Sequence, residues 1–275
     1  MDEPLISIIM GVYNGENTIK KCIDSIISQT YSNWEFIICN DCSTDKTLKI
    51  LSEYKNKDSR FVILNNHKNL RLGATLNRCL KVANGKYIAR MDADDESLSK
   101  RLEIQVKFLE THPEIDCIGC NRIMFDGEKD IGVWKSVENP TRKDLLTKTP
   151  FAHPTIMMKR STYTELGGYT VSKDTMRAED LDLWFRFFAN NYKGYNIQRA
   201  LYRYHESESD LKKRTLKAAL GTAKVYLRGY KILNYPIYKY VYAFKPVLSS
   251  VIPKKIMQSY HLKIMKKDTS LRGFH

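Results

Sequence analysis

The chain has 275 residues, 43% of them hydrophobic, which is enough for the core of one large or two small globular domains. No apolar run has the length of a membrane-spanning helix, and the first one, residues 5–10, follows two acidic residues instead of the basic segment of a signal peptide. The net charge of +14 belongs to residues 211–275, which hold 15 Lys and Arg and one acidic residue, whereas residues 1–210 hold 30 of each sign. We therefore expect a cytoplasmic protein with a neutral domain and a basic tail.

Up to residue 91, short apolar runs alternate with segments of helical spacing. Nearly continuous apolar runs predict strands buried on both faces, and apolar residues that recur on one face predict amphipathic helices. Strands are predicted at residues 5–10, 34–39, 61–65 and 87–91, and helices at residues 18–30, 47–54 and 73–83. This βαβαβαβ order predicts an α/β fold with a mainly parallel, doubly wound sheet.

After residue 91 the pattern becomes mixed. We predict a helix over residues 98–111, antiparallel strands over 116–125 and 131–134, and a strongly amphipathic helix over 178–190. The second part of the domain is therefore expected to combine antiparallel strands with helices.

Two Cys-x-x-Cys pairs, Cys39/Cys42 and Cys117/Cys120, have a spacing that zinc ligands also use. Cys39 and Cys117 lie in apolar runs, where a free cysteine behaves as a small hydrophobic residue. We therefore interpret them as buried strand positions in preference to a zinc site.

Three carboxylates, those of Asp92, Asp94 and Asp95, lie within four residues at the end of the fourth predicted strand. Like charges this close repel, and a divalent cation such as Mg²⁺ or Mn²⁺, which prefers oxygen ligands, would remove the repulsion. Loops that follow the carboxyl ends of parallel strands converge on one ligand crevice. The sequence therefore predicts a metal-dependent site, with a solvated acidic turn as the alternative. The first loop lacks G-x-G-x-x-G, so a dinucleotide is not favoured.

Several segments of residues 1–210, taken in order, resemble the family 2 glycosyltransferases, which have the GT-A fold. The segments are Met10-Gly11-Val12-Tyr13-Asn14-Gly15-Glu16, Asn40-Asp41-Cys42-Ser43-Thr44-Asp45, Gly73-Ala74-Thr75-Leu76-Asn77, Gly85-Lys86-Tyr87-Ile88-Ala89-Arg90-Met91-Asp92-Ala93-Asp94-Asp95, Gly167-Gly168-Tyr169, Glu179-Asp180-Leu181-Asp182-Leu183-Trp184-Phe185-Arg186 and Tyr202-Arg203-Tyr204-His205-Glu206-Ser207. Each segment alone is common, but the ordered set is specific. Two residues depart from the pattern. At the position of Cys42 the family usually has glycine or another small residue, and at the position of Arg71 it often has glycine.

The resemblance implies an inverting glycosyltransferase that moves a sugar from a nucleotide diphosphate sugar, most commonly a UDP-sugar, to a hydroxyl of a saccharide acceptor. In enzymes of bacterial surface-polysaccharide synthesis, we expect that acceptor to be lipid-linked. The resemblance divides the domain into a nucleotide-sugar-binding half, residues 1–98, and an acceptor half, residues 99–210. It assigns the donor to Gly11, Val12, Tyr13, Glu16, Asp41, Arg71, Arg90, Asp92 and Ala93.

Among these, the resemblance implies that Tyr13 stacks beside the nucleotide base and that Asp41 accepts hydrogen bonds from a uracil edge or the ribose. Arg71 and Arg90 would add contacts to the nucleotide. Surface arginines are common, so neither contact follows from the residue type alone.

The resemblance further implies that Asp94, with Asp92 and His205, holds Mn²⁺ or Mg²⁺, which neutralises the charge that develops on the leaving diphosphate. Asp180 would be the general base that takes the proton of the attacking acceptor hydroxyl. The alternative for Asp180 is a helix cap, and the alternative for His205 is a surface histidine. His153 is a further candidate to line the acceptor site.

The basic tail, residues 211–275, interleaves Tyr and Phe with Lys and Arg, a composition that suits an anionic membrane interface. We expect it to place the protein on the inner face of the plasma membrane; the alternative is a helical extension that packs on the domain. Two other functions were weighed. A nucleic-acid-binding protein would leave the acidic crevice unexplained, so no nucleic acid partner is expected. An aspartyl-phosphate phosphatase would carry its D-x-D pair after the first strand, whereas here the pair follows the fourth.

Overall fold

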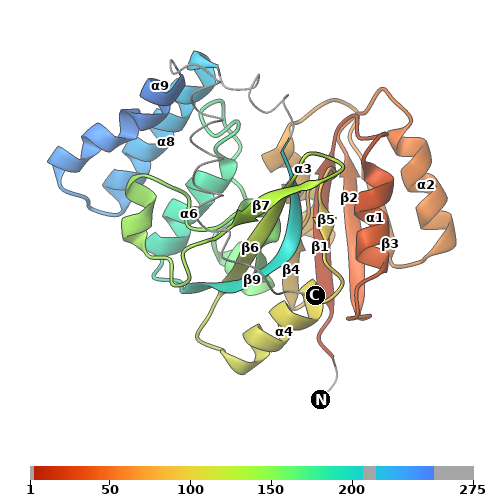
Figure 1. The fold of residues 1–275 in the computed structure, drawn as a ribbon. Helices are drawn as coiled ribbons and strands as arrows, with labels where there is room; N and C mark the ends of the chain where they lie inside the picture. Colours follow the sequence, from red (N-terminus) through yellow and green to blue (C-terminus); the bar gives the residue numbers. More distant parts are fainter. Residues whose placement is uncertain (1–2, 207–214, 251–275) are drawn as a thin grey trace.

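The computed structural model describes residues 3–206 and 215–250 (Figure 1). Every predicted element up to residue 91 is present. The elements are β1 (Ile6–Val12), α1 (Ile19–Ile27), β2 (Trp34–Asn40), α2 (Thr47–Lys57), β3 (Phe61–Asn65), α3 (Leu72–Val82) and β4 (Tyr87–Arg90). Each helix or strand ends within about one helical turn of its predicted bound, because local periodicity fixes the element better than its ends.

The second part of the domain contains elements of more varied length. They are β5 (Glu96–Ser97), α4 (Arg101–Thr111), β6 (Cys117–Phe125), β7 (Asp130–Trp134), η1 (Arg142–Leu146), η2 (His153–Thr155), β8 (Met157–Lys159), α5 (Arg160–Glu165), α6 (Glu179–Ala189) and β9 (Gly194–His205). The two predicted helices and the β6–β7 hairpin are confirmed. The sequence patterns did not indicate β8, which is three residues long, or β9, which carries polar residues on both faces.

Nine strands of the described residues form one sheet, in the order β3-β2-β1-β4-β8-β6-β9-β5, with β7 paired to β6. The first four are parallel, which brings the three predicted loops to the same edge of the sheet. β8 is antiparallel to both β4 and β6, so β6 runs in the same direction as β4, and β9 is parallel to β6. The predicted mainly parallel α/β sheet is thus confirmed.

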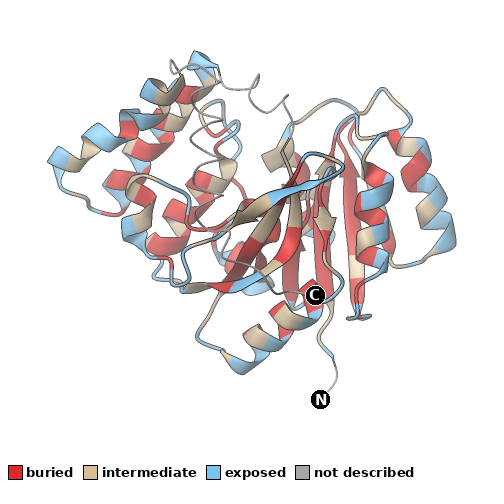
Figure 2. Cartoon of the chain, viewed as in Figure 1, coloured by how far each residue is buried: buried red, intermediate tan, exposed pale blue. Residues whose placement is uncertain are grey.

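Helices cover both faces of the sheet, whose strands are mostly buried (Figure 2). One core packs α1, α2 and α4 against the sheet, and the other packs α3, α5 and α6 against the opposite face. Cys39 and Cys117 are fully buried in the second core and Cys120 in the first, which confirms their interpretation as buried strand positions.

The described part of the tail forms α8 (Leu216–Ile232), η3 (Ile237–Phe244) and α9 (Lys245–Ser250), beside α6 and away from α1 and α2 in Figure 1. The rings of Tyr226 and Tyr230 on α8 meet Phe185 of α6 edge-on, at centroid distances of 5.8 and 5.9 Å. Residues 215–250 are therefore a packed helical extension, the alternative considered for the tail. The other predicted tail segments, residues 211–214 and 251–275, lie outside the described residues. No helix in the described ranges is both long and apolar enough to cross a bilayer.

Candidate active site

A cavity of about 560 Å³ opens at the carboxyl ends of β1 and β2, against residues 170–177. Three predicted donor residues, Tyr13, Asp41 and Arg71, line it together with Glu179. Tyr13 is 51% exposed, so its ring is available to stack on a planar group. The cavity thus gathers residues from the first loop, the second loop and the starts of two helices.

Asp41 is buried and its carboxylate orders the loop that leads into α3. Its Oδ1 accepts hydrogen bonds from Asn66 Nδ2 (2.6 Å) and the backbone nitrogen of Leu70 (2.7 Å), and its Oδ2 accepts one from the backbone nitrogen of Arg71 (2.9 Å). Arg71 itself has φ 72° and ψ 165°, a conformation almost confined to glycine. Asp41 therefore holds a strained backbone in place, and a nucleotide would share its carboxylate with that loop.

Gly11, Val12 and Glu16 shape the first loop without lining the described wall of the cavity. The Val12 carbonyl accepts a hydrogen bond from the backbone nitrogen of Asp41 (2.8 Å), which ties the first two loops together. Glu16 Oε2 accepts one from the backbone nitrogen of Lys46 (3.0 Å), at the start of α2. Their part in donor binding stays a prediction.

The acidic cluster follows β4, at the same edge of the sheet. The Asp94 carboxylate is 46% exposed, and its Oδ2 lies 3.7 Å from Nδ1 of His205, at the end of β9. That Nδ1 is buried and makes no hydrogen bond to any described residue. The predicted metal ligands Asp94 and His205 are therefore brought together, although they are 111 residues apart in the sequence.

Asp95, to which the sequence assigned no role, joins the acidic loop to β9. Its Oδ1 accepts a hydrogen bond from the backbone nitrogen of His205 (2.7 Å). Burial, with the neighbouring charges of Asp92 and Asp94, raises the pKa of Asp95 well above its usual range. The sequence signal for Asp95 was its position as the third carboxylate of the acidic cluster.

Arg90 requires a correction, because its side chain is only 1% exposed and does not reach the surface of the crevice. Its guanidinium forms an ion pair with Asp92. Burial disfavours the charged guanidinium, but Asp92 together with Tyr169 and Tyr202 outweighs this effect, so the pKa of Arg90 is raised. Arg90 therefore positions Asp92 instead of touching a nucleotide, and Ala93 next to it packs on the core.

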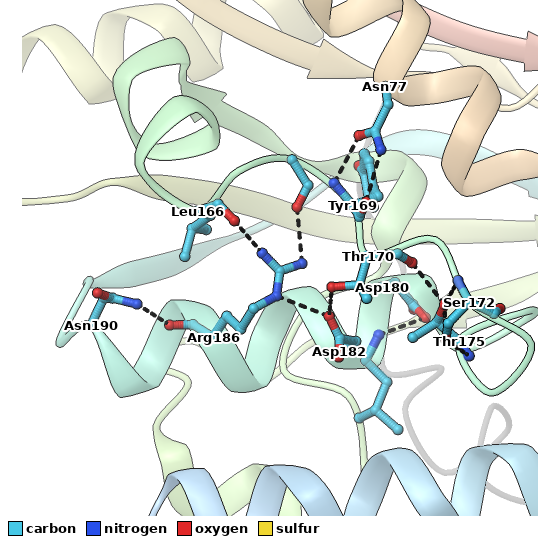
Figure 3. Close-up of polar contacts among 12 residues, drawn as sticks. Asn77, Leu166, Tyr169, Thr170, Ser172, Thr175, Asp180, Asp182, Arg186 and Asn190 are labelled. Atoms are coloured by element: carbon cyan, nitrogen blue, oxygen red, sulfur yellow. Dashed lines mark hydrogen bonds and ion pairs between the residues drawn. The ribbon is translucent and has the colours of Figure 1, made fainter.

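The first turn of α6 holds three carboxylates. Two of them, Asp180 and Asp182, have different partners (Figure 3). Asp180 Oδ1 accepts a hydrogen bond from the backbone nitrogen of Leu181 (2.8 Å). Asp182 Oδ2 accepts one from Thr170 Oγ1 (2.6 Å) and pairs with Arg186 Nε (2.9 Å). The Asp182 carboxylate is thus occupied by structural contacts, whereas no side chain among the described residues is hydrogen-bonded to the Asp180 carboxylate.

The electrostatic environment links Asp180 to the acidic loop. Burial raises the pKa of Asp180; Arg90 lowers it and Asp92 raises it further. Burial, together with Asp180, likewise raises the pKa of Glu179. Glu179, next to Asp180, lines the cavity, and the charges of Arg90 and Asp92 act on Asp180, so we treat the start of α6 and the acidic loop as one candidate site.

His153 does not line the crevice, which corrects its predicted place at the acceptor. It is buried and shares a hydrogen bond of 2.8 Å between its Nε2 and the Tyr169 hydroxyl. Burial, with the nearby charge of Arg90, lowers the pKa of His153 well below its usual value. It is therefore a neutral core residue.

Sequence reasoning missed the wall formed by residues 170–177, which has no apolar periodicity. Within residues 3–206 and 215–250, no group of three or more His, Cys, Asp or Glu side chains is arranged to hold a metal by itself. A cation at Asp94 and His205 would therefore need ligands from a substrate, as Mg²⁺ bound to phosphates commonly has.

Comparison with known proteins places this site in a family. The family model described as "Glycosyl transferase family 2" matches residues 7–168. The "Putative glycosyltransferase EpsE" of Bacillus subtilis (strain 168) is 42% identical over 264 residues, which are 94% of each chain. The "UDP-Glc:alpha-D-GlcNAc-diphosphoundecaprenol beta-1,3-glucosyltransferase WfgD" of Escherichia coli is 30% identical over 218 residues, 79% of this chain and 83% of that protein. The structure of mannosyltransferase PcManGT from Pyrobaculum calidifontis with GDP-Man and Mn²⁺ has a TM-score of 0.66 at 15% identity, and covers 96% of this chain and 81% of its own, which confirms the fold.

Proposed function

This chain belongs to glycosyl transferase family 2, and we propose that it is a metal-dependent, inverting glycosyltransferase that moves a sugar from a UDP-sugar to a hydroxyl of a lipid-linked saccharide in surface-polysaccharide synthesis. The observation that carries the proposal is the pairing of Asp94 with His205, together with the half-buried Asp180 at the start of α6, beside a cavity of nucleotide size. The activity for which WfgD is named supports both the donor and the acceptor class.

The nucleotide would occupy the 560 Å³ cavity, which is within the size range of ligand pockets. The half-exposed ring of Tyr13 would stack on the base. The Arg71 side chain, at the cavity wall, would bind a phosphate or ribose oxygen. Asp41 and Asp92 would fix the ribose end, each already held in place by its own partners.

The residues present fit a divalent cation. Asp94 offers an exposed carboxylate, and His205 offers a buried ring nitrogen that no described residue satisfies. Two protein ligands leave positions for diphosphate oxygens and water, which suits Mn²⁺ or Mg²⁺. Such a cation would neutralise negative charge on the leaving diphosphate.

Asp180 would act as the general base. A carboxylate whose pKa is raised by burial is a stronger proton acceptor than an exposed one. It would take the proton of the acceptor hydroxyl as that oxygen attacks the anomeric carbon from the face opposite the diphosphate. A single displacement of this kind inverts the anomeric configuration.

The tail extension would bring the site to an anionic membrane on the cytoplasmic side. Six large apolar side chains of η3 and α9 are exposed: Ile237, Tyr238, Val241, Tyr242, Phe244 and Leu248. Exposed aliphatic and aromatic side chains beside lysines are typical of interfacial membrane contact. The packed extension and membrane contact are compatible, because α8 buries one side of the extension against α6.

The test is turnover of a UDP-sugar in the presence of Mn²⁺, with Asp94→Asn as the variant. We expect the wild type to release UDP in a Mn²⁺-dependent reaction and the variant to lose both this activity and Mn²⁺-dependent UDP binding, with an unchanged melting temperature. Equal wild-type rates in Mn²⁺ and in EDTA would contradict the proposal.

A further inference from the structure

A second cavity, of about 340 Å³, lies in the acceptor half, between the β6–β7 hairpin and residues 148–152. Its described wall carries three basic side chains, Arg122, Lys135 and Lys148, and no acidic one. Trp134 and Ser136 complete the face that the hairpin contributes. A wall of this composition favours an anionic ligand that also has an apolar or sugar-like face.

Arg122 is the unusual member of this wall. Burial lowers the pKa of its guanidinium, and its Nε is buried without a hydrogen-bond partner among the described residues. The guanidinium carbon lies 5.3 Å from the centroid of the Trp134 ring and 5.4 Å from that of Tyr204. A half-buried guanidinium that lies beside two aromatic rings and has an unsatisfied buried Nε favours an anion to complete its surroundings.

The cavity lies near the proposed reaction centre. β6 runs in the same direction as β4, so its carboxyl end reaches the edge that holds the acidic loop, and Phe125 on β6 pairs with His205 on β9. Arg122 pairs with Tyr202 on β9, and the Tyr202 hydroxyl accepts a hydrogen bond of 3.2 Å from the backbone nitrogen of Asp92 in that loop. The other wall, residues 148–152, continues directly into the buried His153.

We propose that this cavity binds the phosphate-linked sugar of the acceptor, with Arg122, Lys135 and Lys148 on the phosphate groups and Trp134 against the sugar ring. This inference rests on the proposed function for the identity of the ligand as a glycosyl diphosphate. A planar guanidinium forms two hydrogen bonds with a phosphate, and an indole face packs well on the C–H face of a sugar. The cavity would thus hold the acceptor from the side away from the nucleotide.

The first experiment measures binding without donor. N-acetylglucosaminyl diphosphate with a short alkyl chain is titrated into the full-length protein in EDTA, which suppresses diphosphate binding at the metal loop, and tryptophan fluorescence is followed. We expect Arg122→Gln to weaken binding at least about tenfold and Lys148→Gln about two- to fivefold, since a buried charged contact is worth more than an exposed one. Lys143→Gln is the matched control, because Lys143 is an exposed basic residue of η1 outside the cavity wall and should change nothing.

Two further probes separate the parts of the ligand. Inorganic diphosphate should bind more weakly than the glycosyl diphosphate, and free N-acetylglucosamine should bind equally weakly to wild type and Arg122→Gln. Inorganic diphosphate that binds as tightly as the glycosyl compound would overturn the role of Trp134. Equal binding of the glycosyl diphosphate by wild type, Arg122→Gln and Lys148→Gln would overturn the site, as would its failure to bind the wild type.

Kinetics distinguish this inference from the proposed function. In Arg122→Gln we expect a raised KM for the acceptor, with Mn²⁺-dependent hydrolysis of the UDP-sugar and UDP affinity unchanged. Absence of UDP-sugar turnover in the wild type would count against the proposed function alone, because the binding titration is independent of it. Lost hydrolysis in Arg122→Gln would show that Arg122 supports the donor side, and would overturn the assignment to the acceptor.

Discussion

Asp180→Asn separates a general base from a helix cap, because the substitution changes charge but not size. The remaining amide oxygen can still accept the hydrogen bond of 2.8 Å from the Leu181 nitrogen, so the helix start should survive. A general base typically contributes about 10²–10⁴-fold in rate, and a 10²-fold loss corresponds to about 2.7 kcal/mol of transition-state stabilisation. We expect turnover to fall at least about 10²-fold while UDP affinity stays the same.

The same variant should also change the dependence of stability on pH. Because burial raises the pKa of Asp180 in the folded protein, ionisation costs stability as pH rises from the unfolded pKa through the folded one. The cost is fully present above the folded pKa, and Asn removes it. The melting temperature of Asp180→Asn should therefore exceed that of the wild type at pH 8, and the difference should shrink as pH falls toward 4.

Asp182→Asn is the matched control in the same helical turn. It breaks the ion pair with Arg186 and weakens the hydrogen bond from Thr170 in the cavity wall, but Asp182 does not itself line the donor cavity. We expect a loss of about 1–3 kcal/mol in stability, with turnover retained. Refutation is clear in either direction: transfer by Asp180→Asn at close to the wild-type rate would exclude the base, and an inactive but stable Asp182→Asn would move the role to Asp182.

Two predictions concern the tail extension. Gly229→Ala would place a Cβ 2.2 Å from the Phe185 ring, so we expect a net loss of about 1–2 kcal/mol in stability after the gain in helix propensity. Thermal denaturation measures this loss, with Lys231→Ala as the exposed control on α8. An unchanged melting temperature of Gly229→Ala would contradict the packing of α8 on α6. Replacing Ile237 and Val241 together by Ser should weaken flotation with anionic vesicles more than about tenfold at unchanged melting temperature. Val82→Ser, an exposed apolar control on α3, should leave flotation unchanged. Equal flotation of the wild type and the double variant would show that η3 does not contact the membrane.

The elements that sequence periodicity predicted are those whose burial is uniform along the element. β1, β2 and β4 are buried almost throughout, so their apolar runs are continuous and easily recognised. β9 was not predicted, because its burial is irregular and its pairing with β6 contains register shifts. Its sequence therefore shows no alternation of apolar and polar residues. The three residues of β8 are too few to show any period.

The candidate site could be predicted where its residues are contiguous and not where it depends on the direction of a side chain. Asp92, Asp94 and Asp95 are adjacent in the chain, and their mutual repulsion is visible in the sequence. Arg90 is two residues from Asp92, yet only the fold shows that its side chain turns into the core. The basic cavity at Arg122 could not be predicted, because it joins Arg122 to a segment that begins 26 residues later in the chain, at Lys148.

Arg71 connects the departure from the family pattern to the chemistry of the site. Both Arg71 (φ 72°) and Cys42 (φ 62°) have positive φ, which explains why glycine is common in these positions. The ψ of 165° places Arg71 in a region almost exclusive to glycine, where a side chain costs about 1–3 kcal/mol. Because Arg71 lines the donor cavity, we expect its positive charge to bind the ligand and so to offset the cost of the strained backbone.

Arg71→Gly tests this reasoning, because it should raise the stability of the protein and at the same time weaken UDP binding. Relief of strain should exceed the entropy that glycine adds to the unfolded chain, about 0.4–1 kcal/mol, so the melting temperature should rise. The hydrogen bond from the backbone nitrogen to Asp41 is retained, and Arg71→Lys, which keeps both the charge and the strain, is the matched control. Loss of the guanidinium should weaken UDP binding about three- to tenfold in Arg71→Gly and less in Arg71→Lys. A lower melting temperature would refute the strain, and unchanged UDP affinity would show that the cavity binds the donor without Arg71.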